Sequence, residues 1–335
     1  MPRELAPVSV IVPAYNAGAT IGRALESIAA QTLPPAEVIV VDDGSTDATA
    51  ERARAMQAVL APVRLVVVSQ ENAGAGAARN RAVREASQDY LAFLDADDEW
   101  LPGKLERSMQ VLEDGDYLLV AHDYLDTTGG RDVHVDCLRR FNEGRDPYVT
   151  LYLKGYIPSI SVVTRRDAVL AAGGFDETLR NAQDFDLWLK LLADPETTFT
   201  LFGEALARYH LSEGSIMSHT DRRIVCCREI ALRYLPALKS RRVSRFVNLW
   251  RRLAIVYGEA MRAQPGRKWR YALAAAAALP VDTLRVFTGF DGDGKAPRET
   301  APAVIAGAVW VIAVLGLYVV QFKSLAGPIL GALGF

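Results

Sequence analysis

Short apolar runs alternate with amphipathic segments through the first hundred residues of the chain. Apolar residues such as Ile21, Leu25 and Ile28 recur at helical spacing between these runs. We predict strands over residues 8–13, 38–41, 65–68 and 90–94, and helices over residues 19–30, 48–60 and 75–86. Buried strands that alternate with helices are typical of α/β proteins, so we expect a mostly parallel sheet with helices on both faces.

Polar, acidic or small residues follow each predicted strand directly. These strand ends are 13–16, 42–45, 72–74 and 95–98, and two of them are acidic. Ligands of open parallel sheets bind outside the carboxyl ends of the strands. The sequence therefore predicts one binding site at this edge of the sheet.

The rest of the chain is less regular. A clear amphipathic helix is expected over 184–192, mainly helical structure over 222–290, and a Gly/Asp linker over 291–294. We divide the chain into two halves of an α/β domain, a basic helical region, a membrane span and a short apolar tail, at residues 1–110, 111–221, 222–299, 300–322 and 323–335.

Cysteine and histidine usage excludes two classes of protein. The three cysteines cannot form a disulfide scaffold, because Cys226 and Cys227 are adjacent and Cys137 stands alone. The four histidines show no metal-binding spacing, which makes a zinc enzyme an unlikely interpretation.

The charges are distributed unevenly along the chain. Residues 1–221 hold 34 Asp and Glu against 20 Lys and Arg, whereas residues 222–270 hold 14 Lys and Arg against two Glu. No charged residue occurs over 300–322, and about 20 helical residues span a hydrocarbon core of roughly 30 Å. We predict a transmembrane helix there, the alternatives being a buried core helix or a helix packed on a partner.

The basic region bears on orientation and on partners. Because Lys and Arg crowd the N-terminal side of the predicted span, the catalytic head is expected in the cytoplasm, with the basic residues near anionic lipid. Helices with solvated arginine faces are a second interpretation. Nucleic-acid binding is a third, but the chain has no recognisable nucleic-acid motif, so we predict no nucleic-acid partner.

Individual residues at the predicted edge have a chemical and a structural interpretation. Asp95 and Asp97 can bind a divalent cation or form a capped turn. Tyr15 can stack on a nucleobase or pack beneath a loop. Asp43 can accept hydrogen bonds from a base or ribose, or cap the next helix, for which Ser45 and Asp47 are also available.

Two helix starts carry further candidates. Gly74 opens the helix that carries Arg79, and such helix starts favour anions. Asp184 stands at the start of another helix, where it can serve as a general base or as an N-cap.

Together these motifs identify the chain as similar to family 2 glycosyltransferases, which have the GT-A fold. The resemblance covers roughly residues 7–215, and five ordered motifs are more specific than any one of them. The matching segments are 8–16, 37–47, 72–80, 94–98 and 174–188.

The resemblance implies an inverting transferase that uses a nucleotide-sugar donor and Mg²⁺ or Mn²⁺. It makes residues 1–110 the nucleotide-sugar-binding half of the domain and residues 111–221 the acceptor-binding and catalytic half. Asp184 would deprotonate the acceptor hydroxyl, and Asp95 and Asp97 would lie at the cation and diphosphate. The acceptor would be a saccharide or lipid-linked hydroxyl at the cytoplasmic membrane face. The donor site implied by the resemblance comprises Pro13, Ala14, Tyr15, Asp43, Asn72, Gly74, Arg79 and Asp95.

Two positions depart from the family pattern. Gln183 stands where the family usually has Glu, and His210 lies where related chains often carry an arginine; we expect His210 to have a packing role. Two alternative functions stay open: a nucleotidyltransferase, which releases pyrophosphate, and an inactive membrane scaffold of the same fold.

Overall fold

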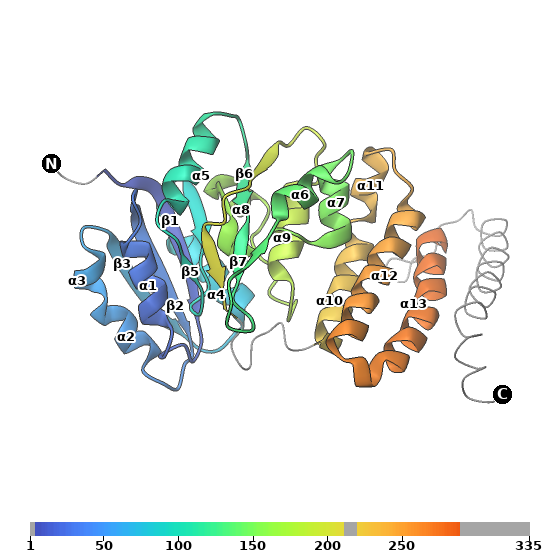
Figure 1. Ribbon diagram of the computed structural model, residues 1–335, viewed down its shortest axis with the longest axis horizontal. Coiled ribbons are helices and arrows are strands. Elements are labelled where there is room, and N and C mark those ends of the chain that lie inside the picture. Colours follow the sequence, from blue (N-terminus) through green and yellow to red (C-terminus); the bar gives the residue numbers. More distant parts are fainter. Residues whose placement is uncertain (1–3, 211–219, 289–335) are drawn as a thin grey trace. The chain divides into compact units, whose positions relative to one another are not determined.

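The computed structural model describes residues 4–210 and 220–288. The chain divides into two compact units, of which the first ends at Val243 and the second begins at Ser244. The first unit contains both β-sheets and helices α1 to α11, and the second contains α12 and α13 (Figure 1).

The predicted linker, membrane span and tail, residues 291–335, lie outside the described residues. In the part of the chain that is described, no helix is long and apolar enough to cross a bilayer.

A seven-stranded sheet forms the core of the first unit, and it confirms the α/β prediction. Its strand order is β10-β6-β9-β4-β1-β2-β3, and every neighbouring pair is parallel except those made by β9. The strands are β1 (Ala6–Ala14), β2 (Pro35–Asp43), β3 (Arg64–Gln70), β4 (Tyr90–Phe93), β6 (Leu119–His122), β9 (Val163–Arg165) and β10 (Phe199–Phe202).

Both faces of this sheet are covered. Val8, Val10 and Val12 on β1 join one apolar cluster with α1, while Ile11, one residue out of phase, is equally buried on the opposite face. Figure 1 shows β1, β2 and β3 side by side with α1, α2 and α3 along them. These helices and the next two are α1 (Ile21–Ala29), α2 (Thr49–Ala55), α3 (Gln57–Leu60), α4 (Ala75–Glu85) and α5 (Lys104–Glu113).

The predicted helix over 48–60 is wrong in one respect, because it is broken at Met56 into α2 and α3. The expected cap, Ser45 or Asp47, is also wrong, because the N-cap residue of α2 is Ala48 and no side chain caps the helix. Asp47 accepts a hydrogen bond from the Thr49 amide (3.0 Å) at the start of α2 and another from the Gly18 amide (2.9 Å). Ser45 instead accepts from the amide of Asn16 (2.9 Å), so it joins two strand ends and caps nothing.

A second, four-stranded sheet lies in the region where the sequence pattern is weak. Its order is β5-β11-β7-β8, and three of its strands have only three residues. The strands are β5 (Glu99–Trp100), β7 (Tyr124–Asp126), β8 (Val133–Val135) and β11 (Ala207–Tyr209). Because β5 begins one residue after Asp98, this sheet lies directly beside the acidic strand end.

The remaining helices come from residues 137–288 of the chain. The helix predicted over 184–192 is observed as α9 (Gln183–Leu191). The basic region is helical as expected, and α10 and α11 belong to the first unit. The other helices are α6 (Cys137–Asn142), α7 (Pro147–Lys154), η1 (Ser159–Ser161), α8 (Arg166–Ala171), α10 (Thr220–Arg233), α11 (Leu235–Ser240), α12 (Arg245–Ala263), η3 (Pro265–Arg267) and α13 (Lys268–Thr288).

Candidate active site

The end of β1 presents an aromatic ring to solvent. The Tyr15 side chain is 55% exposed, which excludes the alternative that it packs beneath a loop. Ala14 is buried and Pro13 is half-buried, so the backbone at this strand end is fixed by packing. An exposed ring on a fixed strand end is suited to stack on a base.

Asp43 at the end of β2 holds the loop that follows β3. Its carboxylate is buried and accepts hydrogen bonds from the amides of Ala73 (2.9 Å) and Gly74 (2.8 Å) and from the side-chain amide of Gln70 (2.8 Å). The Asn72 side chain donates to the Asp43 carbonyl at 2.9 Å. The helix-cap alternative for Asp43 is therefore wrong, and Asp43 ties Asn72 and Gly74, two other predicted donor-site residues, to the end of β2.

Arg79 connects the acidic residues that the sequence placed at this edge. It is 6% exposed, and its guanidinium donates to Asp95 at 2.6 Å. Burial opposes its charge, but the carboxylates of Asp95, Asp184 and Asp97 together raise the pKa of Arg79. The charge of this buried guanidinium is therefore coupled to the three carboxylates that are expected to bind a divalent metal ion and to act as the base.

The segment after β4 is held by backbone contacts and by Asp98. The Asp98 side chain is 1% exposed and accepts from the His210 amide at 2.7 Å. Burial raises the pKa of Asp98 well above its ordinary value, and the charges of Asp95 and Asp97 raise it further. Arg23 donates to the Asp97 carbonyl, so this acidic turn is fixed from both sides.

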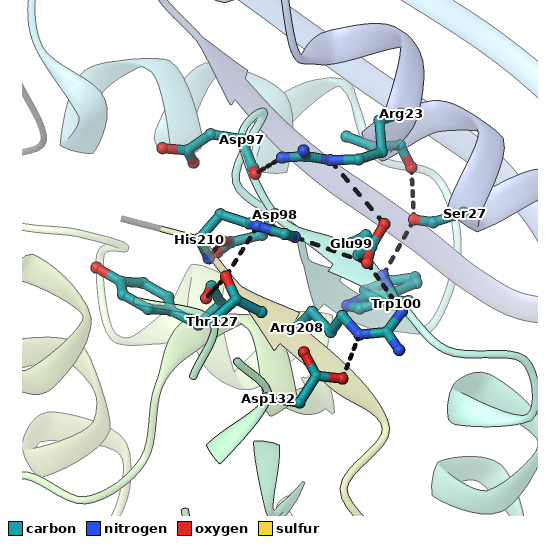
Figure 2. Close-up of polar contacts among 12 residues, drawn as sticks. Arg23, Ser27, Asp97, Asp98, Glu99, Trp100, Thr127, Asp132, Arg208 and His210 are labelled. Atoms are coloured by element: carbon teal, nitrogen blue, oxygen red, sulfur yellow. Dashed lines mark hydrogen bonds and ion pairs between the residues drawn. The ribbon is translucent and has the colours of Figure 1, made fainter. Parts of the chain in front are cut away.

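Figure 2 shows the polar contacts that continue into the second sheet. Arg208 on β11 donates to Glu99 (3.1 Å) and to Asp132 (3.0 Å). The Nδ1 atom of His210 lies 2.9 Å from the Thr127 hydroxyl, and the packing role expected for this histidine stays a prediction. The Asp97 carboxylate points away from these contacts in Figure 2.

Asp184 lies in the first turn of α9. The residue before the helix start is Ala182, in the left-handed conformation (φ 58°), and no side chain caps the helix, so the N-cap alternative for Asp184 is wrong. Its Oδ1 accepts from the Phe185 amide at 2.8 Å. Burial raises the pKa of Asp184, while the charge of Arg79 acts in the opposite direction. A carboxylate with a raised pKa is a better proton acceptor in catalysis.

The residue that departs from the family pattern faces inward. Gln183 is buried, and its side-chain amide donates to the Leu179 carbonyl at 2.8 Å. It therefore braces the loop before α9, which is a structural contact that a glutamate carboxylate cannot make in its charged form.

Two contacts that position this region were not predicted. Asn80 on α4 donates to the Phe175 carbonyl (2.9 Å) and accepts from the Phe175 amide (2.8 Å). Arg233 on α10 donates at 2.8 Å to both Asp176 and the fully buried Asp186. Arg233 is more than 45 residues from both acids, and no pattern along the chain marks that pairing.

The carboxylates fit a cation that is shared with a diphosphate. Among residues 4–210 and 220–288, no group of three His, Cys, Asp or Glu side chains is placed to hold a metal alone. Mg²⁺ sites at phosphates commonly use one or two protein carboxylates and take the remaining oxygens from substrate and water. Asp95 and Asp97, two half-buried oxygen donors beside one another, meet that requirement.

Comparison with known proteins supports this interpretation. The family description "Glycosyl transferase family 2" matches residues 9–169. TuaG of Bacillus subtilis, a glycosyltransferase named for teichuronic acid biosynthesis, is 32% identical over 222 residues, covering 63% of this chain and 82% of TuaG. The chain is a family 2 glycosyltransferase.

Other relatives of the transferase agree. The amylovoran biosynthesis glycosyltransferase AmsB of Erwinia amylovora is 32% identical over 212 residues, covering 61% of the chain and 69% of AmsB. An uncharacterized glycosyltransferase of Nostoc sp. is 39% identical over 129 residues, which are 38% of the chain and 39% of that relative's length.

Solved structures show the same fold. TarS residues 1–349 of S. aureus in complex with UDP-GlcNAc gives a TM-score of 0.64 at 20% identity, covering 82% of the transferase and 81% of that chain. The mannosyltransferase PcManGT of Pyrobaculum calidifontis, in complex with GDP-Man and Mn²⁺, gives a TM-score of 0.57 at 22% identity. The alignment covers 95% of the transferase and 84% of that chain. The predicted GT-A fold is confirmed for the described residues.

Proposed function

We propose that the transferase moves a sugar from a nucleoside diphosphate donor to an acceptor hydroxyl, with inversion at the anomeric carbon. The observation that carries this proposal is the buried Arg79, which donates to Asp95 at 2.6 Å and has a pKa that the charges of Asp97 and Asp184 raise as well. A donor diphosphate and an acceptor hydroxyl are the two groups that need a cation and a base side by side.

The donor lies along the strand ends. The exposed Tyr15 ring stacks on the base, and the amides of the loop held by Asp43 line the adjoining edge. Two of the similar solved structures hold a nucleotide-sugar, UDP-GlcNAc in TarS and GDP-Man in PcManGT, which supports this class of donor.

A divalent cation, Mg²⁺ or Mn²⁺, would be held by Asp95 and Asp97 and would neutralise the diphosphate as it departs. The Mn²⁺ in the PcManGT structure supports such a metal. The chain's own cation at this point is Arg79, which donates to the Asp95 carboxylate at 2.6 Å and orients it.

Asp184 acts on the acceptor. It takes the proton of the hydroxyl as the acceptor oxygen bonds to the anomeric carbon, and the bond from that carbon to the diphosphate oxygen breaks on the opposite face. The nucleoside diphosphate leaves with the bonding electrons. Burial, which raises the pKa of Asp184, makes this carboxylate the proton acceptor of the site.

The acceptor is a saccharide or a lipid-linked precursor at the cytoplasmic face of a membrane. The names of TuaG and AmsB, which refer to teichuronic acid and amylovoran biosynthesis, favour a polysaccharide product. The basic region and the uncharged segment 300–322 favour attachment of the catalytic head to that membrane.

Asp184→Asn tests the base. We expect it to bind donor as the parent does and to lose turnover by at least about 100-fold, the range for removal of a general base. Asp167→Asn is the matched control, because Asp167 also lies in a first helical turn and accepts from the next amide, at 2.7 Å, but is exposed on α8.

The readout is the product released from a panel of nucleotide-sugars. A nucleoside diphosphate and an inverted product are expected, whereas pyrophosphate points to a nucleotidyltransferase and donor binding without turnover to a scaffold. Full activity in Asp184→Asn, or a retained anomeric configuration, contradicts the proposal.

A further inference from the structure

The second unit is built on a helical hairpin, the orange α12 and α13 of Figure 1. Side chains of the two helices bond across it: the Trp250 indole donates to the Thr283 hydroxyl at 2.8 Å. Near the turn, the Tyr271 hydroxyl donates to the Gln264 side chain at 3.0 Å. Tyr271, Leu279 and Thr283 are buried, so this face of α13 is occupied by packing within the unit.

The outward face of α13 is apolar as well. Trp269, Leu273 and Val281 are 54%, 71% and 48% exposed, and with the exposed Ala277 they follow one another at spacings of four residues. They therefore form one stripe along the helix. From 271 to 281, every residue of α13 that reaches solvent is Ala, Leu, Pro or Val.

Surface helices of soluble proteins carry polar residues at such positions. Helix α4 of the same chain does, since its fully exposed residues are Arg84 and Glu85. An exposed apolar stripe such as Trp269, Leu273, Ala277 and Val281 marks a surface that interacts with a partner or a membrane.

The charge beside the stripe indicates what that occupant is. Arg262, Arg267, Lys268 and Arg270 are all exposed around the turn where α13 begins. No Asp or Glu occurs between 260 and 281. A tryptophan at the edge of an apolar stripe, next to a cluster of basic residues, is the pattern of helices that lie in the interface of an anionic bilayer.

We propose that the outward stripe of α13 and the basic turn before it form a docking surface for an anionic lipid bilayer. The apolar side chains enter the boundary between headgroups and acyl chains, and the basic side chains contact lipid phosphates. The proposal rests on the proposed attachment of the catalytic head to a membrane, and it needs neither donor nor acceptor.

A fluorescent depth probe tests the proposal on the full chain in lipid vesicles. Leu273→Cys takes an environment-sensitive label, and the three native cysteines are buried, so the unsubstituted chain serves as the labelling control. Ala254→Cys is the matched control, an exposed small residue on α12 of the same hairpin. The quencher is a nitroxide attached to the upper acyl chain of the lipid.

We expect the nitroxide to quench the label at Leu273→Cys and not at Ala254→Cys in vesicles that contain phosphatidylglycerol. A label that emits as in an apolar environment but is not quenched would show that protein covers the stripe, and a label that emits as in water would show that nothing does. Either result overturns the proposal.

A second variant tests whether the basic residues before α13 are needed for binding to the vesicles. Each basic residue near an anionic surface strengthens binding about fivefold. Changing Arg267, Lys268 and Arg270 to Gln should therefore weaken the stripe's partitioning about 100-fold, to the level seen with pure phosphatidylcholine. Unchanged quenching in this variant contradicts an anionic surface. Donor binding by the same preparations reports on the proposed function separately.

Discussion

Replacing Arg233 with Met tests how the helix carrying the base is held. Arg233 pairs with Asp176 and with Asp186, whose side chains are 17% and 0% exposed. Breaking a fully buried ion pair costs about 3–5 kcal/mol. Because the Arg233 side chain is itself 34% exposed and Lys190 lies 3.9 Å from Asp186, part of that penalty is relieved. We expect a loss of about 2–3 kcal/mol.

The assay is urea unfolding of the full chain followed by tryptophan fluorescence. Arg81→Met on the exposed Arg81–Glu85 pair is the control and should change the free energy of unfolding by no more than about 0.5 kcal/mol. Asp186→Asn should cost less than Arg233→Met, because it removes the buried charge and leaves the cation bound to Asp176. The reasoning is refuted if Asp186→Asn costs more, or if Arg233→Met matches the control.

Three further outcomes are expected. Arg79→Met removes the largest influence that lowers the pKa of Asp184, so the acidic limb of kcat/KM against pH should move to higher pH; a limb that stays in place contradicts the pairing. Gly174→Ala should lower the free energy of unfolding, measured by thermal unfolding, by about 2 kcal/mol or more. Gly174 has a φ of +73°, and an added Cβ would lie 2.4 Å from the side-chain amide oxygen of Asn80. Gly173→Ala is the control and should cost about 1 kcal/mol, because Gly173 also has a positive φ but a Cβ there would meet no neighbouring atom within 4 Å. Burial lowers the pKa of Lys104, so the folded state resists its protonation and stability should rise with pH up to the ordinary lysine pKa. Lys104→Met should remove that slope in urea unfolding, and a slope that persists contradicts the assignment.

The first half of the fold was predictable because its strands are long and buried on both faces. In β1 only Ser9 is polar, and β2 contains the apolar run Val38–Val41, after which Asp42 and Asp43 mark the end of the strand. The second sheet was not predictable, since strands such as β7 and β8 have three residues, too few to show a period. The antiparallel direction of β9 is also a property of packing that its sequence does not encode.

The candidate site was predictable where residues follow strands directly. Tyr15, Asp95 and Asp97 lie where the strand ends place them, and their assigned roles stay predictions. The partners of Asp43 and Asp186 were not predictable, because they come from loops and helices about 30 and 47 residues away. Burial, which decides the proton affinity of Asp184, also depends on those distant elements.

The position of β9 has a consequence during synthesis of the chain. β4, which leads into the acidic turn, pairs with β1 on one side and with β9 on the other. About 70 residues separate the two strands, so at about 5–20 residues per second β4 keeps an unpaired edge for several seconds while the ribosome completes β9. Open strand edges pair with other chains. Nascent chains that pause before residue 163 are therefore the forms of this protein most exposed to aggregation and to capture by chaperones.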